Sequence, residues 1–182
     1  FGVGVIDAIN HYYDRPDIPI GANWNDEVGD PKDKMSAEKL AKDSAAFGHD
    51  LISAMDAIEQ TFLNREILAK QADSSVVYIT IGHTKGLYDL LVSSPDDISP
   101  LSGKELITSK IKCWVALGAL GAHNENNQFR KDWNFFFNNT ADYTAYLVSR
   151  FPTAIYFIDA GSKVMTGKSL IPTDPGNIVR TV

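Results

Sequence analysis

The stretch DWNFFFNN, residues 132–139, places an acid and an amide around one Trp and directly before three Phe. A carboxylate accepts hydrogen bonds, and a side-chain amide both donates and accepts them, so Asp132 and Asn134 could hold the hydroxyls of a sugar. The same two residues could instead cap a helix that begins after a loop. The stretch therefore marks either the rim of a polar pocket or the start of a helix.

Other polar residues of interest follow predicted strands. His83 lies in GHTKG, Asn126 lies in GALGAHNENNQFRKDWN, and Asp159 lies in DAG. An unpaired carboxylate at the end of a buried strand is costly, so Asp159 either lines a pocket or pairs with a neighbour. A lone histidine is more often structural than catalytic, which makes His83 and His49 secondary candidates.

The elements that must position these residues alternate between strands and helices. Apolar runs at 75–82, 112–119 and 153–161 predict strands buried on both faces, and 18–22 predicts a short buried strand. Helices are expected at 84–93, 103–111 and 140–151, the last capped by Thr140 or Asn139. Strands and helices in this order predict an α/β fold with a mostly parallel sheet flanked by helices. Ligands of such sheets bind beyond the carboxyl ends of the strands, where the three polar loops lie.

Two more helices are predicted from apolar spacing, and a polar loop is predicted over 25–50. The first helix, within residues 1–13, is expected to face the core with Val5, Ile6, Ile9, Tyr12 and Tyr13. The second, over residues 51–70, is expected to do so with Leu51, Met55, Ile58, Phe62 and Ile67. Both patterns are typical of amphipathic helices.

Composition excludes several classes of partner. The net charge of −6 argues against nucleic acid or an anionic membrane as the main partner. No apolar run approaches the roughly 20 residues that span a bilayer. Cys113 is the only cysteine, so no internal disulfide can form, and its apolar neighbours predict a buried, inert thiol.

The ordered set of motifs resembles the inosine-uridine-preferring nucleoside hydrolase family, in its divergent bacterial branch. The resemblance rests on DAINHYYDRPDIPIG, SVVYITIGHTKGLYDLL, SPDDISPLSGKEL, KCWVALGALGAHNENNQFRKDWN and FIDAGSKVMTG. It implies one Rossmann-like domain over residues 1–182, truncated at both ends and missing its first strand. It also implies hydrolysis of the ribose–base bond, assisted by calcium.

The resemblance assigns roles to individual residues. Asp132 and Asn134 match a Glu-x-Asn segment that bonds the ribose, and Asn126 matches another sugar contact. Asp159 stands where the family has a Glu. The Asp-rich calcium motif, which includes the general base, is expected before residue 1. Lys85 stands at a Thr whose carbonyl binds calcium in the family, so its ammonium is expected to repel the metal.

Two hypotheses of different class follow. The first is an N-ribosyl hydrolase that is inactive as this chain because its metal ligands and base lie elsewhere. The second is a nucleoside- or sugar-binding protein with a degenerate metal site and no catalysis. Either way the partner is a small nucleoside or sugar, and the chain is expected to form a homo-oligomer. Localisation stays open between the bacterial cytoplasm and periplasm.

Overall fold

The structure is a computed structural model that describes residues 2–23, 56–119, 126, 131–137, 139–158, 171–172 and 174–175. Contacts divide the chain into two compact units. The first comprises Phe1–Trp24, Asp30–Leu63 and Val164–Val182, and the second comprises Asn25–Gly29 and Asn64–Lys163. Organisation as one domain stays a prediction, and the loop predicted over 25–50 lies outside the described residues.

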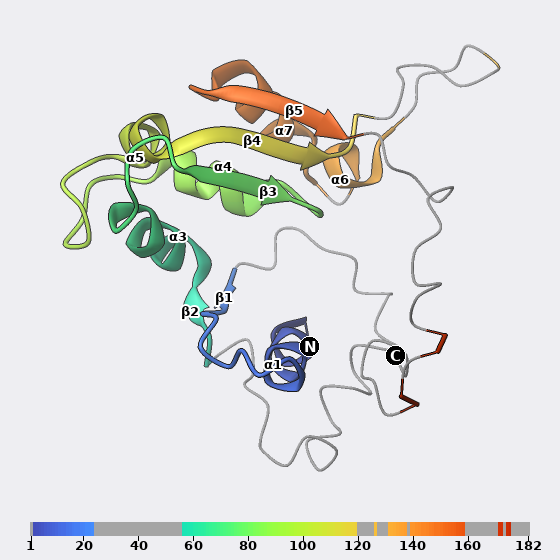
Figure 1. Cartoon of the computed structure of the whole chain (residues 1–182). Coiled ribbons are helices and arrows are strands. Elements are labelled where there is room, and N and C mark those ends of the chain that lie inside the picture. Colours follow the sequence, from blue (N-terminus) through green and yellow to red (C-terminus); the bar gives the residue numbers. More distant parts are fainter. Residues whose placement is uncertain are drawn as a thin grey trace. The chain divides into compact units, whose positions relative to one another are not determined.

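The first unit contains helix α1 (Gly2–Tyr12) and two short parallel strands, β1 (Gly21–Ala22) and β2 (Ile58–Glu59) (Figure 1). The predicted core face of α1 is wrong in part, because Ile6, Tyr12 and Tyr13 are exposed. The buried residues of α1 are instead Val3, Gly4, Asp7, Ala8 and Asn10. The buried amide of Asn10 donates to the carbonyl of Ile18 at 3.2 Å, which fixes the polar side of the helix inward.

Helix α3 (Gln60–Ala69) confirms the second half of the predicted helix, while residues 51–55 lie outside the described part of the chain. Ile58 belongs to β2. The predicted apolar face is wrong at Phe62 and Ile67, which are exposed. α3 buries Leu63, Arg65 and Leu68, a face that is rotated from the expected one and contains a guanidinium.

The second unit is built on a three-stranded parallel sheet of order β3-β4-β5, as predicted for an α/β fold. Its strands are β3 (Val76–Thr80), β4 (Ile111–Leu117) and β5 (Ala154–Ile158). Helices α4 (Lys85–Val92) and α7 (Ala141–Arg150) lie behind the sheet in Figure 1, and α5 (Gly103–Lys110) leads into β4. Their apolar residues form one core with β4: Leu87, Leu90, Leu106, Ile107, Trp114, Ala116 and Leu147.

The prediction that all strands are buried on both faces is wrong. Val77 and Ile79 of β3 and Tyr156 and Ile158 of β5 are exposed. Side chains alternate along a strand, so the partly buried residues of β3 face the helices and the others face the opposite side. In Figure 1 no described helix of the second unit lies on that second face. Cys113 of β4 is nevertheless buried, as predicted.

Candidate functional site at the carboxyl edge of the sheet

The carboxyl ends of β3, β4 and β5 meet at one edge because the three strands are parallel. Two bonds tie the edge together: the indole nitrogen of Trp114 donates to the hydroxyl of Thr80 at 2.9 Å, and the Gly118 amide donates to the Ile158 carbonyl at 3.0 Å. The short helix α6 (Trp133–Phe136) lies beside the strand ends in Figure 1. Asp132 and Asn134, two of the residues that sequence reasoning singled out, lie at this helix.

Asp132 is the N-cap of α6, as one of its two interpretations predicts. Its Oδ1 accepts from the backbone amides of Asn134 at 2.9 Å and Phe135 at 3.1 Å. These bonds satisfy amide groups that have no partner within the helix.

Asn134 points to the sheet. Its Nδ2 donates to the carbonyl of Leu117, the last residue of β4, at 2.9 Å. Phe135 holds the same side of α6 in place, because a Cβ on Gly118 would lie 2.6 Å from the Phe135 ring. Trp133 is 54% exposed, because Asn134 and Phe135 occupy the side of α6 that faces the sheet.

Lys85 begins α4 and is buried, yet its charge is compensated. Its Nζ donates to both carboxylate oxygens of Asp89, at 2.6 and 2.7 Å, and lies 5.1 Å from the centre of the Tyr143 ring on α7. Beside it, the hydroxyls of Thr84 and Thr144 are hydrogen bonded at 2.8 Å. The ammonium is therefore part of the contact between α4 and α7. The expected repulsion of a metal by Lys85 stays a prediction.

The other candidate residues are spread more widely. His83 is partly buried in the loop between β3 and α4, and Asn126 is exposed in a turn. Asp159 and His49 lie outside the described residues. The structure thus brings Asp132 and Asn134 together on α6 and leaves the roles of the other four as predictions.

Calcium ligands are not evident in the part of the chain that the structure describes. No group of three or more His, Cys, Asp or Glu side chains occurs there that could hold a metal ion. Calcium binding therefore stays a prediction.

Thr140 is the N-cap residue of α7, but the predicted side-chain cap is absent. Its hydroxyl donates instead to the Phe137 carbonyl at 2.8 Å, and its backbone amide donates to the same oxygen at 3.2 Å. Asn139 occupies the turn with a left-handed φ of 63°, which Asn tolerates well. The turn between α6 and α7 is therefore fixed by its own backbone and one hydroxyl.

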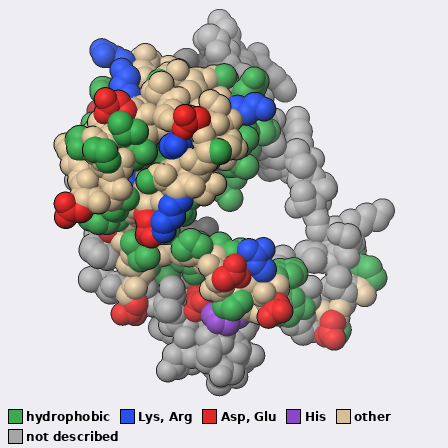
Figure 2. All heavy atoms as spheres, turned by 60° about the vertical axis from the view of Figure 1, so that its left-hand side comes forward, with side chains coloured by type: hydrophobic (Ala, Val, Ile, Leu, Met, Phe, Trp, Pro, Cys, Tyr) green, Lys and Arg blue, Asp and Glu red, His purple; other side chains and the backbone are tan. Residues whose placement is uncertain are grey.

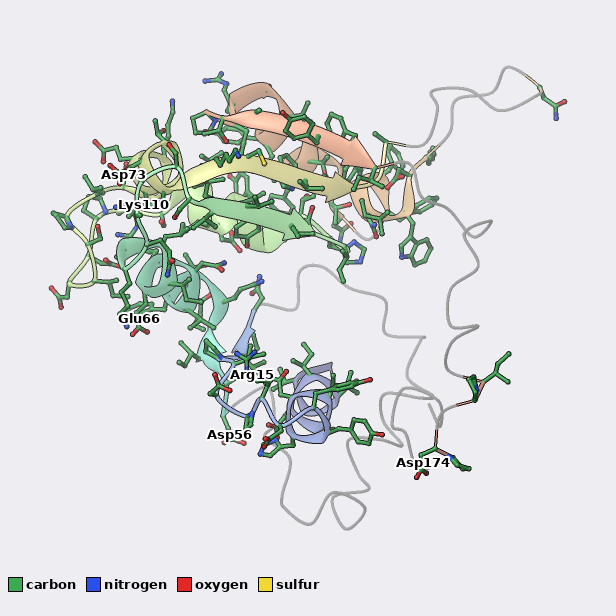
Figure 3. All side chains as sticks on the ribbon, viewed as in Figure 1. Arg15, Asp56, Glu66, Asp73, Lys110 and Asp174 are labelled. Carbon is green, nitrogen blue, oxygen red and sulfur yellow. The ribbon has the colours of Figure 1, made fainter. Side chains whose placement is uncertain are left out.

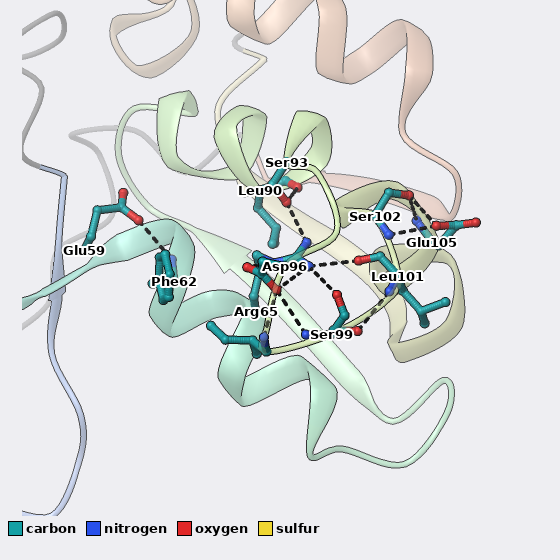
Figure 4. Close-up of polar contacts among 11 residues, drawn as sticks. Glu59, Phe62, Arg65, Leu90, Ser93, Asp96, Ser99, Leu101, Ser102 and Glu105 are labelled. Atoms are coloured by element: carbon teal, nitrogen blue, oxygen red, sulfur yellow. Dashed lines mark hydrogen bonds and ion pairs between the residues drawn. The ribbon is translucent and has the colours of Figure 1, made fainter.

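Sequence reasoning missed a buried cluster around Arg65, which we call the Arg65 cluster and define as Arg65, Ser93, Asp96, Ser99 and Leu101 (Figure 4). The guanidinium of Arg65 is 1% exposed and donates to both Asp96 oxygens at 2.7 and 2.9 Å. Asp96 also accepts from two backbone amides of its own turn. A charged residue among apolar ones on α3 is the one signal that could have drawn attention to it.

Charged side chains of both signs are scattered over the face that Figure 2 shows, with no large patch of one sign among the residues drawn in colour. No described helix combines the length and the apolar character that crossing a membrane requires.

Comparison with known proteins adds no relative. Neither the family models, nor the curated proteins, nor the solved structures gave a match to this chain.

Proposed function

We propose that this chain is the sugar-binding part of an N-ribosyl hydrolase, which cleaves the ribose–base bond of nucleosides. The observation that carries the proposal is the position of Asn134, whose amide bonds the last carbonyl of β4. This bond fixes a polar side chain at the carboxyl edge of a parallel sheet, where α/β folds bind their ligands. The resemblance of Asp132-Trp133-Asn134 to the ribose-binding segment of nucleoside hydrolases supports the same assignment.

The Asn134 amide retains hydrogen-bonding capacity for a sugar. An amide has two N–H donors and one acceptor oxygen, and the bond to Leu117 uses one donor. Asp132 is held in one orientation by its cap bonds, so a hydroxyl would meet a carboxylate that is already ordered. Ordered partners lower the entropic cost of binding. In this proposal Asn134 and Asp132 hold ribose hydroxyls, and the hydrolytic base is supplied from residues other than these.

A second candidate is a nucleoside- or sugar-binding protein without catalysis. The pair formed by Lys85 and Asp89 favours it, because a buried ion pair occupies the start of α4, where the resemblance expects a calcium ligand. The described residues also hold no metal cluster. Binding through Asn134 and Asp132 needs no metal, whereas activation of a water in this family does.

Turnover and calcium binding separate the two candidates. The full-length gene product is assayed with inosine and uridine, and calcium is titrated into it by calorimetry. Turnover together with heat that saturates near one ion per chain supports the hydrolase. Nucleoside binding with neither turnover nor calcium heat supports the binding protein. Absence of both nucleoside binding and turnover contradicts both candidates.

A further inference from the structure

A second concave surface lies on α6 and α7, away from the sheet. It is an open depression of about 420 Å³ lined by Phe136, Phe137, Asn139, Ala141 and Asp142. Asn134 and Phe135 face the sheet, whereas Phe136 and Phe137 are 40% and 39% exposed on the opposite side of the short helix. The depression is therefore separate from the sugar site proposed above.

Two aromatic rings of this depression lie nearly perpendicular to each other. Phe136 and Phe137 stand 5.8 Å apart with their planes at 81°, and Trp133 stacks beside Phe137 at 5.5 Å. The turn that follows is fixed by two bonds from Thr140 to the Phe137 carbonyl. The positions of these rings are thus held by backbone structure and do not depend on a bound ligand.

The chemistry of the lining suits a cation. Aromatic ring faces carry negative potential and attract an ammonium group that lies over them. Asp142, exposed in the first turn of α7, adds a carboxylate to the same depression. Phe136 already shows this attraction, because the Nζ of Lys131 lies 4.6 Å from the centre of its ring. The net charge of −6 favours a cationic partner as well.

We propose that Phe136, Phe137 and Asp142 form a binding site for an organic ammonium group. The rings hold its alkyl substituents and its charge by cation–π contact, and the carboxylate pairs with it. The same chemistry has two sources, a free quaternary amine or a methylated lysine side chain of a partner protein. This site is independent of any hydrolase activity, since it shares no residue with the sugar site.

The test measures binding to the 182-residue chain by amide shifts in NMR titrations. Choline probes a free amine, Nε-trimethylated acetyl-lysine amide probes a side chain, and 3,3-dimethyl-1-butanol is the neutral isostere of choline. We expect both cations to shift the amides of residues 136–142 and to bind about fivefold tighter than the alcohol. Tighter binding of one cation identifies the source.

Matched variants locate the site. Asp142→Asn and Phe137→Leu should each weaken choline binding about three- to fivefold, whereas Asp97→Asn, an exposed carboxylate elsewhere, should leave it unchanged. Lys131→Met should strengthen binding about twofold, because it removes a competing ammonium from Phe136. Equal affinity for the neutral alcohol, or unchanged affinity in both Asp142→Asn and Phe137→Leu with melting temperatures intact, overturns the proposal.

Discussion

Two irregular segments of the second unit are held in opposite ways. The segment 93–102 is fixed by the Arg65 cluster, in which one buried guanidinium donates to a carboxylate, a hydroxyl and two carbonyls. The segment 131–140 is fixed by a cap, by one bond from Asn134 to β4 and by the packing of Phe135 on Gly118. The first uses its polar groups for structure, while the second leaves three aromatic rings exposed. The comparison teaches that an acidic residue in a loop does not by itself indicate a site, since Asp96 and Asp132 both accept structural hydrogen bonds.

The amino-terminal edge of the sheet resembles the Arg65 cluster in this respect. Figure 3 shows Asp73 and Lys110 next to each other at that edge, and their ion pair measures 2.7 Å. Asp73 also accepts from the hydroxyl of Ser109 at 2.8 Å. The acidic residue at the amino edge thus already serves local polar contacts. The ligand site is expected at the opposite edge.

The largest expected effect comes from Arg65→Met. It removes a buried charge that satisfies four partners, so the free energy of unfolding should fall by about 3–5 kcal/mol. Denaturant unfolding followed by circular dichroism measures this change. Arg150→Met, which alters an exposed side chain, should change it by less than about 0.5 kcal/mol. Equal effects of the two substitutions would remove the distinction between the segments.

Asp132→Ala should have a smaller effect, about 1 kcal/mol lost from the free energy of unfolding, because the cap of α6 is removed. Asp97→Ala, an exposed loop carboxylate, is the matched control and should lie within about 0.5 kcal/mol of the parent chain. Thermal melts of the three proteins provide the comparison. If Asp132→Ala melts like the control, the cap does not stabilise α6.

Acid should weaken the Arg65 cluster. The hydrogen bond from Arg65 holds the pKa of the Asp96 carboxyl below its ordinary value of 3.8. A carboxyl with a lowered folded-state pKa stabilises the fold above its unfolded pKa, and the stabilisation is lost as the pH falls through the folded value. Stability should therefore decline below about pH 4, and the decline should be shallower in Asp96→Asn. Identical pH profiles of the two chains would show that Asp96 does not contribute.

Much of the secondary structure could be predicted from sequence, but the buried faces could not. Periodicity and caps predict β3, β4, β5, α4, α5 and α7, because these depend on neighbouring residues. Exposure of Ile79 or Phe62 depends on what covers an element, and apolar composition does not contain that information. A buried apolar strand and an exposed apolar strand have the same pattern.

The candidate site, like the fold, could be predicted only in part from the sequence. The choice between cap and pocket for Asp132 depended on whether a helix begins at the next residue, and it does. The bond from Asn134 to Leu117 and the pairing of Arg65 with Asp96 join residues 17 and 31 positions apart, so no local pattern could reveal them. The sequence predicts that Lys85 repels a metal, whereas in the structure its ammonium pairs with Asp89, four residues along the same helix.

The substitution Asn134→Ala is the most direct test of a sugar site at the carboxyl edge of the sheet. In the full-length protein, melting temperature and either kcat/KM or the Kd for inosine are measured for Asn134→Ala and for Trp133→Phe, which keeps an aromatic ring at an exposed position. We expect Asn134→Ala to lose about 1 kcal/mol of stability and to weaken kcat/KM or affinity about ten- to a hundredfold. Trp133→Phe should change both quantities little. A loss of stability in Asn134→Ala with unchanged kinetics and affinity would show that the amide only fastens α6 to β4, and would contradict a sugar site at this edge.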